Sequence, residues 1–312
     1  MEILYRRILL PLDGSDVARS ALATAVGISR LLDTRLTLMS VLQEGSTSAR
    51  PVGATHGAGS DGSADIEPDA ESLAASYLDA IATELQQLGV QTDSTVVTNP
   101  DAASEIVLTA RDRDAQLIVM ASRGRSGIVR GLLGSVTDRV IHSSPIPVMV
   151  VPADDDSDVA RWTPRSIIVP LDGSELAESA LPHAEMMAGV ANIPIILVRS
   201  VPFPITYGAD MYAGMSTAMI ASAEEDEKIA RQYLAEVATR LRAHGHHVET
   251  HMSAGHPRTE IAAVAQETED SIVIMTTRGA SGLTRWVVGS VADSVIRSSG
   301  VPVLIIPPGT GI

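Results

Sequence analysis

The chain alternates between two hydrophobic patterns. Strand-like runs, most of them short continuous aliphatic blocks, occur at residues 7–12, 35–41, 90–97, 117–120 and 146–151. Between them, apolar residues recur at helical spacing within residues 15–32, 69–88, 101–112 and 135–143. This alternation of strands and helices predicts a parallel sheet with helices on both faces.

The second part of the chain repeats this pattern. The run from Ile167 to Ser174 matches the run from Ile8 to Ser15 position by position. Further strands are expected at residues 195–201, 247–253, 272–275 and 301–306, and helices at 224–243, 258–267 and from 290 onward. A polar, acidic stretch separates the two copies. We therefore expect a first domain over residues 1–153, a linker over 154–164 and a second domain over 165–312.

The predicted fold class is α/β, with two doubly wound five-stranded parallel sheets in tandem. In such sheets, ligands bind outside the carboxyl ends of the strands, where the winding direction reverses. With strand order 3-2-1-4-5, the turn after the first strand and the loop after the fourth strand flank that crevice. One ligand site per half is therefore expected.

A glycine-bearing loop follows the fourth strand of each half. One copy runs Ala121-Ser122-Arg123-Gly124, nine residues, Gly134-Ser135, and the other Thr276-Thr277-Arg278-Gly279, nine residues, Gly289-Ser290. Such a loop gathers free backbone N–H groups at the positive end of the next helix, which suits phosphate. The alternative is an ordinary connection whose glycines only turn the chain. Two copies with the same gap favour the phosphate hypothesis.

The helices after these loops begin with a serine. Ser135 and Ser290 are expected to be the N-caps, and each is followed by an aspartate, Asp138 or Asp293, in the spacing of a capping box. Arginines lie in both loops, where they either steer phosphate or only solvate the surface. The sequence leaves these two readings open.

Composition excludes several classes of function. The chain has 312 residues and no cysteine, so a disulfide framework is impossible and a reducing cytoplasm is the expected compartment. The net charge of −15 argues against a nucleic-acid partner, and an aromatic content of 3% argues against base stacking. Lys228 is the only lysine, which excludes a P-loop of the Gly-x4-Gly-Lys type. We expect neither a secretion signal nor a membrane span, because no apolar run is long enough.

These motifs together resemble the universal stress protein family in its tandem two-domain form, over nearly the whole chain. The resemblance rests on Pro-Leu-Asp-Gly-Ser at residues 11–15 and 170–174 and on the Ser-Val pairs at residues 40–41 and 200–201. It also rests on the two glycine loops, which are similar to the family's ATP-binding signature Gly-x2-Gly-x9-Gly-[Ser/Thr]. The resemblance implies a sheet architecture like that of the adenine-nucleotide alpha-hydrolases.

The resemblance also implies a set of residues that bind ATP in each half. In the first half these are Pro11, Asp13, Val41, Ala121, Ser122, Arg123, Gly124, Arg125, Ser126, Gly127, Gly134, Ser135, Val136 and Thr137. In the second half they are Pro170, Asp172, Val201, Thr276, Thr277, Arg278, Gly279, Ala280, Ser281, Gly282, Gly289, Ser290, Val291 and Ala292. Backbone amides of the loops and helix starts would hold the phosphates. The prolines and valines would line adenine and ribose, and the aspartates would lie near the sugar and a Mg²⁺ or Mn²⁺ ion.

Both halves depart from the family signature at its first glycine, which is Ala121 in one and Thr276 in the other. A β-branched residue resists positive φ, so we expect the second site to be the weaker one if that conformation is required.

Two other kinds of site were weighed. Ser122, Ser126 and Ser135 could be nucleophiles, but no Gly-x-Ser-x-Gly elbow accompanies them, so capping is favoured. His247, Glu249 and His251 share one strand face and could bind a metal, although a solvated edge strand is the simpler interpretation. No catalytic residue and no protein-held metal site is assigned.

The function implied by the resemblance is that of a cytoplasmic stress-response regulator that acts through bound ATP or another adenine nucleotide. One alternative is a ligand-free scaffold whose edge strands pair the halves as an intramolecular pseudo-dimer and join further copies as a homodimer. Another is a slow ATPase or autophosphorylating enzyme, although neither a general base nor a Walker lysine is evident.

Overall fold

The structure of the chain is a computed structural model, and it describes residues 5–43, 69–123, 133–153, 158–201, 217–277 and 288–309. Side chains of the helix over residues 217–243 are described from residue 224 onward. The chain divides into two compact units, Tyr5–Trp162 and Thr163–Ile312. Each unit is described by itself below.

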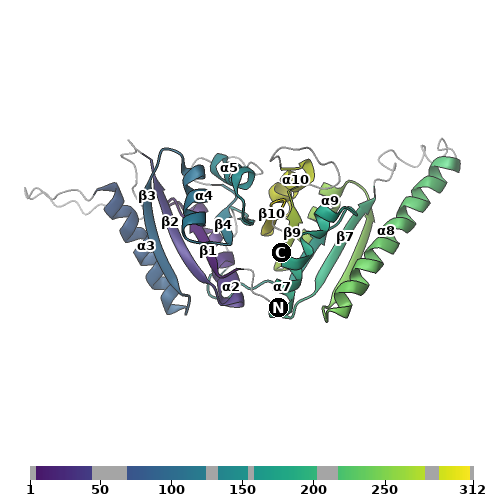
Figure 1. Cartoon of the computed structure of the whole chain (residues 1–312), viewed down its shortest axis with the longest axis horizontal. Helices are drawn as coiled ribbons and strands as arrows, with labels where there is room; N and C mark the ends of the chain where they lie inside the picture. The colour runs from purple at the N-terminus through teal and green to yellow at the C-terminus, as the bar shows by residue number, and fades with distance from the viewer. Residues whose placement is uncertain are drawn as a thin grey trace, which may run out of the picture. The chain divides into compact units, whose positions relative to one another are not determined.

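The first half alternates strands and helices along its whole length (Figure 1). Its elements are β1 (Arg7–Pro11), α1 (Asp16–Arg19), α2 (Ala21–Leu32), β2 (Arg35–Leu42), α3 (Ala70–Gln87), β3 (Thr92–Thr98), α4 (Ala102–Asp112), β4 (Leu117–Ala121), α5 (Ser135–Ser143) and β5 (Val148–Val151). Neighbouring strands pair in parallel in the order β3-β2-β1-β4-β5. The winding direction therefore reverses between β1 and β4.

The second half repeats this arrangement. Its elements are β6 (Ser166–Pro170), α6 (Glu175–Glu178), α7 (Leu181–Ala191), β7 (Ile195–Val201), α8 (Thr217–Ala243), β8 (Val248–Ala254), α9 (Pro257–Glu267), β9 (Ser271–Thr276), α10 (Ser290–Ser298) and β10 (Val303–Ile306). The parallel strand order is β8-β7-β6-β9-β10. The predicted α/β fold class, with strand order 3-2-1-4-5 in each half, is confirmed.

The central strands of both sheets are buried on both faces. All residues of β4, β5, β9 and β10 are buried, as are the middle residues of β1 and β6. The outer strands β3 and β8 are more exposed, with no fully buried residue in β3. Figure 1 shows the long helices α3 and α8 running along this outer part of each sheet. The burial explains why the central strands consist of uninterrupted aliphatic residues.

Several boundaries differ from the sequence-based expectation. β5 and β10 begin at Val148 and Val303, just after a proline, because Pro147 and Pro302 have no N–H to donate to the sheet. The helix expected over residues 15–32 is divided at Ser20, whose hydroxyl donates to the carbonyls of Val17 and Pro152. α8 begins at Thr217, earlier than the expected residue 224.

The end of the first compact unit lies within the stretch expected to be a linker. Trp162 is buried and packs against α2, where a Cβ added to Gly27 would lie 2.6 Å from the indole. Arg30 of the same helix donates to the Ala160 carbonyl at 2.7 Å. Residues 158–162 therefore pack on the first half.

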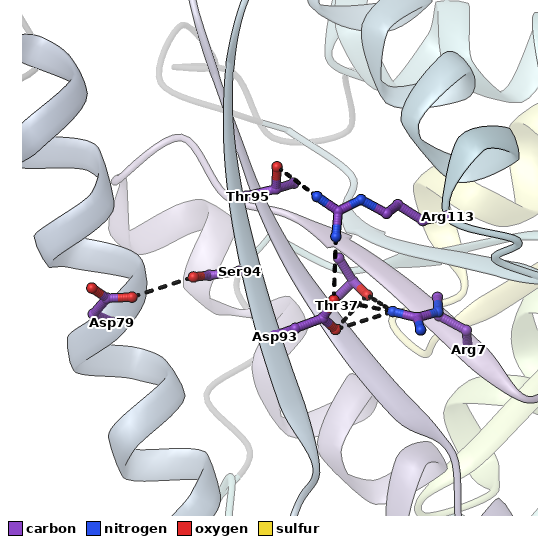
Figure 2. A network of polar contacts seen from close by, with 7 residues as sticks. All are labelled: Arg7, Thr37, Asp79, Asp93, Ser94, Thr95 and Arg113. Atoms are coloured by element: carbon purple, nitrogen blue, oxygen red, sulfur yellow. Dashed lines mark hydrogen bonds and ion pairs between the residues drawn. The ribbon is translucent and has the colours of Figure 1, made fainter.

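A polar network joins the first three strands of the first half (Figure 2). Arg7 of β1 donates to Thr37 of β2 at 2.9 Å and contacts both carboxylate oxygens of Asp93 of β3 at 3.1 Å. Thr37 in turn donates to Asp93 at 2.8 Å, and Arg113 reaches Asp93 at 3.4 Å and Thr95 at 3.1 Å. The network fixes the outer strands in register through side chains as well as through the backbone ladder.

Candidate functional site

The first half contains a cavity of about 400 Å³ beside the place where the winding direction reverses. Its floor comes from the ends of β1, β2 and β4, and its walls come from α3, α4 and the start of α5. Of the expected site residues, the cavity is lined by Pro11, Asp13, Val41, Ala121, Arg123, Gly134, Ser135, Val136 and Thr137. Its volume is within the range of pockets for small molecules and cofactors.

The turn after β1 is held by its own side chains. The Asp13 carboxylate oxygen Oδ1 accepts hydrogen bonds from the amide of Ser15 at 3.0 Å and from its hydroxyl at 2.6 Å. Gly14 has a φ of 80°, a conformation that favours glycine. The Ser15 hydroxyl then accepts from the amide of Ala18 and caps α1, as the sequence predicted. The motif Asp-Gly-Ser is therefore a rigid turn at the edge of the cavity.

The glycine loop is closed at its base by backbone hydrogen bonds. The amide of Ser122 donates to Val151 at 2.7 Å, and the amide of Gly134 donates to the carbonyl of Ser122 at 2.8 Å. In the second half, the amides of Thr277 and Gly289 make the equivalent bonds, to Ile306 and Thr277. All four amides donate within their own chain, and two of them, those of Ser122 and Thr277, are among the loop amides expected to hold phosphate.

The amides at the start of α5 have no acceptor within their own helix. The first intrahelical bond runs from the Asp138 amide to the Gly134 carbonyl. The amides of Ser135, Val136 and Thr137 therefore precede any intrahelical acceptor, as at every helix start. All three residues line the cavity. This places the positive end of the α5 dipole at the cavity wall.

The predicted N-caps of α5 and α10 are wrong by one residue. The N-caps are Gly134 and Gly289, in extended conformation, and neither helix has a side-chain cap hydrogen bond. Ser135 and Ser290 are the first helical residues instead. The sequence pattern fits both alternatives, because glycine is itself an acceptable N-cap.

The concern about the first glycine of the signature does not apply. Ala121 and Thr276 are the last residues of strands β4 and β9, and neither is among the described residues with positive φ. A β-branched residue is well suited to a strand. In the first half, the hydroxyl of Thr137 donates to the Ala121 carbonyl at 2.9 Å and ties α5 to β4.

The cavity is also lined by residues that the sequence analysis did not assign to the site. Ser40 of β2 and Tyr77 of α3 both line it. The Tyr77 hydroxyl is buried and meets no hydrogen-bond partner in ordinary geometry within the described part of the chain. Burial raises the pKa of this hydroxyl, and nearby Arg19 opposes the increase. Both halves have a tyrosine at the same spacing before the glycine that ends the long helix, Gly89 or Gly245, and this repeat was the available signal.

The second half places different side chains at the equivalent positions. The β6–β7 register makes Arg199 the counterpart of Ser40, and the spacing to Gly245 makes Tyr233 the counterpart of Tyr77. The Arg199 guanidinium lies 4.9 Å from the centroid of the Tyr233 ring. It also lies beside the turn after β6, where a Cβ added to Gly173 would be 2.8 Å from Nη1.

A charge pair near these tyrosines is reversed between the halves. Arg19 and Glu84 form an ion pair at 3.7 Å in the first half. Glu178 and Arg240 take their places in the second half and also form an ion pair. Glu178 in addition accepts a hydrogen bond from the Tyr233 hydroxyl at 2.9 Å. Burial raises the pKa of Tyr233, and this hydrogen bond adds to the increase.

The remaining predicted residues of the second half fall into three groups. Pro170 ends β6, and Asp172 forms the same turn as Asp13, with Ser174 donating to its Oδ1 at 3.0 Å and 2.6 Å. Val291 and Ala292 lie in the first turn of α10. Val201 pairs with Ala254 and occupies the register position of Leu42, so Ser200 is the counterpart of Val41. The assumed equivalence of Val41 and Val201 is therefore wrong by one residue, which exchanges the faces of the sheet.

Some predicted site residues lie outside the described residues. They are Gly124, Arg125, Ser126 and Gly127 in the first half and Arg278, Gly279, Ala280, Ser281 and Gly282 in the second.

Two histidines just after the end of the long helix α8, His244 and His246, lie beside a carboxylate of α7. His244 lies 2.7 Å and His246 lies 3.4 Å from the Glu185 carboxylate, while His247, Glu249 and His251 are exposed. Within the described ranges, no three His, Asp or Glu side chains group closely enough to hold a metal ion. In the same ranges, no helix is long and apolar enough to cross a membrane.

Fold and cavity together define a tandem α/β protein whose first half has a cavity at the reversal point of its parallel sheet. The chain belongs to the universal stress protein family. The sequence model of that family matches it twice, over residues 4–152 and 164–307. The resemblance noted in the sequence is thereby confirmed.

Individual relatives agree with this assignment. A universal stress protein of Mycolicibacterium smegmatis is 26% identical over 196 residues, which cover 63% of this chain and 63% of the relative. One from Synechocystis is 33% identical over 150 residues, 48% of this chain and 87% of the relative. The match thus spans less than two thirds of the length of the mycobacterial relative. The crystal structure of a universal stress protein from Archaeoglobus fulgidus has a TM-score of 0.69, with 22% identity over 98% of this chain and 99% of that one, and it supports the fold.

Proposed function

We propose that the first half binds an adenine nucleotide, ATP in the first instance, in the cavity beside β1 and β4, and that the protein regulates a stress response through this bound state. The observation that carries the proposal is the cavity itself. It brings together nine residues that the family resemblance implies for ATP, from loops more than a hundred residues apart in the chain.

The phosphate end of the nucleotide would lie at the start of α5. The amides of Ser135, Val136 and Thr137 lack intrahelical acceptors, and the helix dipole favours an anion there. Arg123 also lines this part of the cavity and adds a positive charge there. A chain of net charge −15 needs such local positive potential to attract a polyphosphate.

The adenosine end would lie against the apolar wall. Val41, Leu73 and Ile106 supply aliphatic surface, and the buried Tyr77 hydroxyl supplies a donor that still lacks a partner of good geometry within the described residues. Because this hydroxyl is already shielded from water, a hydrogen bond to a ligand acceptor would form without a further desolvation cost for the hydroxyl. A Mg²⁺ or Mn²⁺ ion would be held chiefly by the phosphates, with Asp13 as the nearby carboxylate.

Further parts of the proposal rest on the sequence. They are two domains over residues 1–153 and 165–312, a nucleotide site in each half, pairing of the halves through their edge strands, a homodimer, and a cytoplasmic location.

Calorimetric titration of the full chain with ATP, with and without Mg²⁺, tests the proposal. Saturable binding is expected, and GTP should bind more weakly because the apolar wall is lined with few polar groups. Absence of heat with ATP at several temperatures, together with no shift of the melting temperature, would favour the ligand-free scaffold. Phosphate release at the protein-free rate is expected over the same titration, and a faster rate would favour the slow ATPase.

A further inference from the structure

The crevices of the two halves are built on the same frame. Both have the turn Asp-Gly-Ser after the first strand, held by the same pair of hydrogen bonds at 3.0 Å and 2.6 Å. Both have a long helix with a tyrosine at the matching position. In the first half, Gly14, Ser40 and Tyr77 enclose one side of the cavity.

In the second half, the guanidinium of Arg199, the counterpart of Ser40, contacts the counterparts of the other two residues, Gly173 and Tyr233. Arg199 extends from the position of Ser40 and reaches both the Gly173 turn and the Tyr233 ring. A Cβ added to Gly173 would lie 2.8 Å and 3.3 Å from the two terminal nitrogen atoms of Arg199. The guanidinium therefore leaves no space for a further atom between itself and the Gly173 turn. Contact with the face of an aromatic ring stabilises the cation in this position.

The polar groups around Arg199 are also arranged differently. In the first half, the Tyr77 hydroxyl has no well-placed partner within the described residues and has the cation Arg19 nearby. In the second half, the Tyr233 hydroxyl already donates to Glu178, which Arg240 also contacts. The donor that a ligand could use is therefore occupied, and a carboxylate stands where the first half has a guanidinium.

We infer that Arg199 closes the second crevice and is the residue that restricts nucleotide binding to the first half. The inference rests on the proposed function and limits it to a single nucleotide per chain. The Arg199 side chain fills the space that corresponds to the proposed base and ribose site of the first half. Ser40, which is small and lines the cavity, leaves the same space open.

Exchange of the two residues tests this inference. Calorimetry of the full chain with ATP and Mg²⁺ should give a stoichiometry of a single ATP for the wild type. Arg199→Ser should add a second equivalent, and Ser40→Arg should remove the first. The control is Arg231→Ser on the exposed face of α8, where Arg231 pairs with Glu227, and it should bind like the wild type. Circular dichroism and the melting temperature show whether Ser40→Arg is folded, and Arg199→Ser carries the test if it is not.

The outcomes separate the two claims. Two equivalents in the wild type, or a single equivalent that persists in Arg199→Ser, would overturn the inference about Arg199 and leave nucleotide binding by the first half intact. Absence of binding in the wild type would overturn the proposed function itself.

Discussion

The two halves of this chain differ little in their sheets and much in their crevices. Each sheet has five parallel strands in the same order, and the turn after the first strand has the same hydrogen bonds in both. The first crevice is an open cavity with Ser40 and Tyr77 in its wall, whereas Arg199 and Tyr233 contact each other at the matching place in the second. The comparison teaches that a duplicated frame does not imply a duplicated site, because one long side chain can fill the space that a ligand needs.

The largest expected effect comes from filling the first crevice at the start of α5. Gly134→Val adds a branched side chain to the cavity wall and replaces a good N-cap by a poor one, although the extended backbone there accepts valine. ATP affinity should fall at least about 100-fold, or about 3 kcal/mol. Calorimetry measures the change.

Gly289→Val is the matched control, since Gly289 is the N-cap of α10. It has the same cost in helix capping but should leave ATP affinity unchanged. Equal loss in both variants would mean that the effect is one of folding and not of the crevice.

A second difference between the halves concerns a buried position on the helix after the first strand. His183 of α7 is buried, and its counterpart on α2 is Thr24. Burial lowers the pKa of His183 from 6.5 to about 4. Because the unfolded chain binds the proton more readily, stability is complete above pH 6.5 and is lost as the pH falls toward 4, by up to about 3 kcal/mol.

His183→Thr should remove this part of the pH dependence. Urea unfolding of wild type and variant at pH 7 and pH 5, followed by circular dichroism, gives the difference in slope. Parallel pH profiles would show that His183 is not protonated on unfolding in this range. The first half, with Thr24, contributes no such dependence at the same position.

A side-chain hydrogen bond joins α5 to β4 in the first half. Thr137 donates to the Ala121 carbonyl, whereas its counterpart Ala292 has no hydroxyl. Thr137→Val leaves a buried carbonyl without this donor and should destabilise the start of α5 by about 1–2 kcal/mol. Hydrogen exchange of the α5 amides measures the loss, and Thr137→Ser, which keeps the hydroxyl, should retain most of the protection. Faster exchange in Thr137→Ser than in Thr137→Val would contradict this account.

The smallest expected effects come from the paired tyrosines. Tyr233→Phe removes a hydrogen bond to Glu178 and should cost about 1 kcal/mol of stability, since the partner is partly exposed. Tyr77→Phe removes a hydroxyl that has no well-placed partner within the described residues, so stability should not fall. Thermal unfolding distinguishes the two. A larger loss in Tyr77→Phe would show that its hydroxyl is already satisfied.

The sheets could be predicted from the sequence because their central strands are buried on both faces. Uninterrupted aliphatic blocks have few other places in a folded chain, and the parallel direction of the strands follows from their alternation with helices. The first residues of β5 and β10 were harder to predict, because both strands begin only after Pro147 and Pro302, which have no backbone N–H to donate. The sequence predicts Ser135 as the N-cap of α5, one residue after the observed N-cap Gly134, because the capping pattern fits both residues.

The crevices could be predicted only in part. The motif residues Asp13 and Gly134 pointed to the right place because parallel strands bring their carboxyl ends together. Ser40 and Arg199 could not be compared from the motifs alone, since aligning the two Ser-Val pairs shifted the second strand by one residue. The partners of Tyr77 and Tyr233 lie on α1 and α6, and only the three-dimensional arrangement of these helices reveals the reversed charge pair.

Hydrogen exchange with ATP and Mg²⁺ tests most directly whether the helix starts of the two halves are unequal as anion sites. Overlapping peptides analysed by mass spectrometry would resolve the amides of residues 135–137 from those of residues 290–292. The account predicts slower exchange at residues 135–137 when ATP is added and unchanged exchange at residues 290–292. Protection at residues 290–292, with or without protection at residues 135–137, or unchanged exchange at both helix starts under saturating ATP, would contradict it.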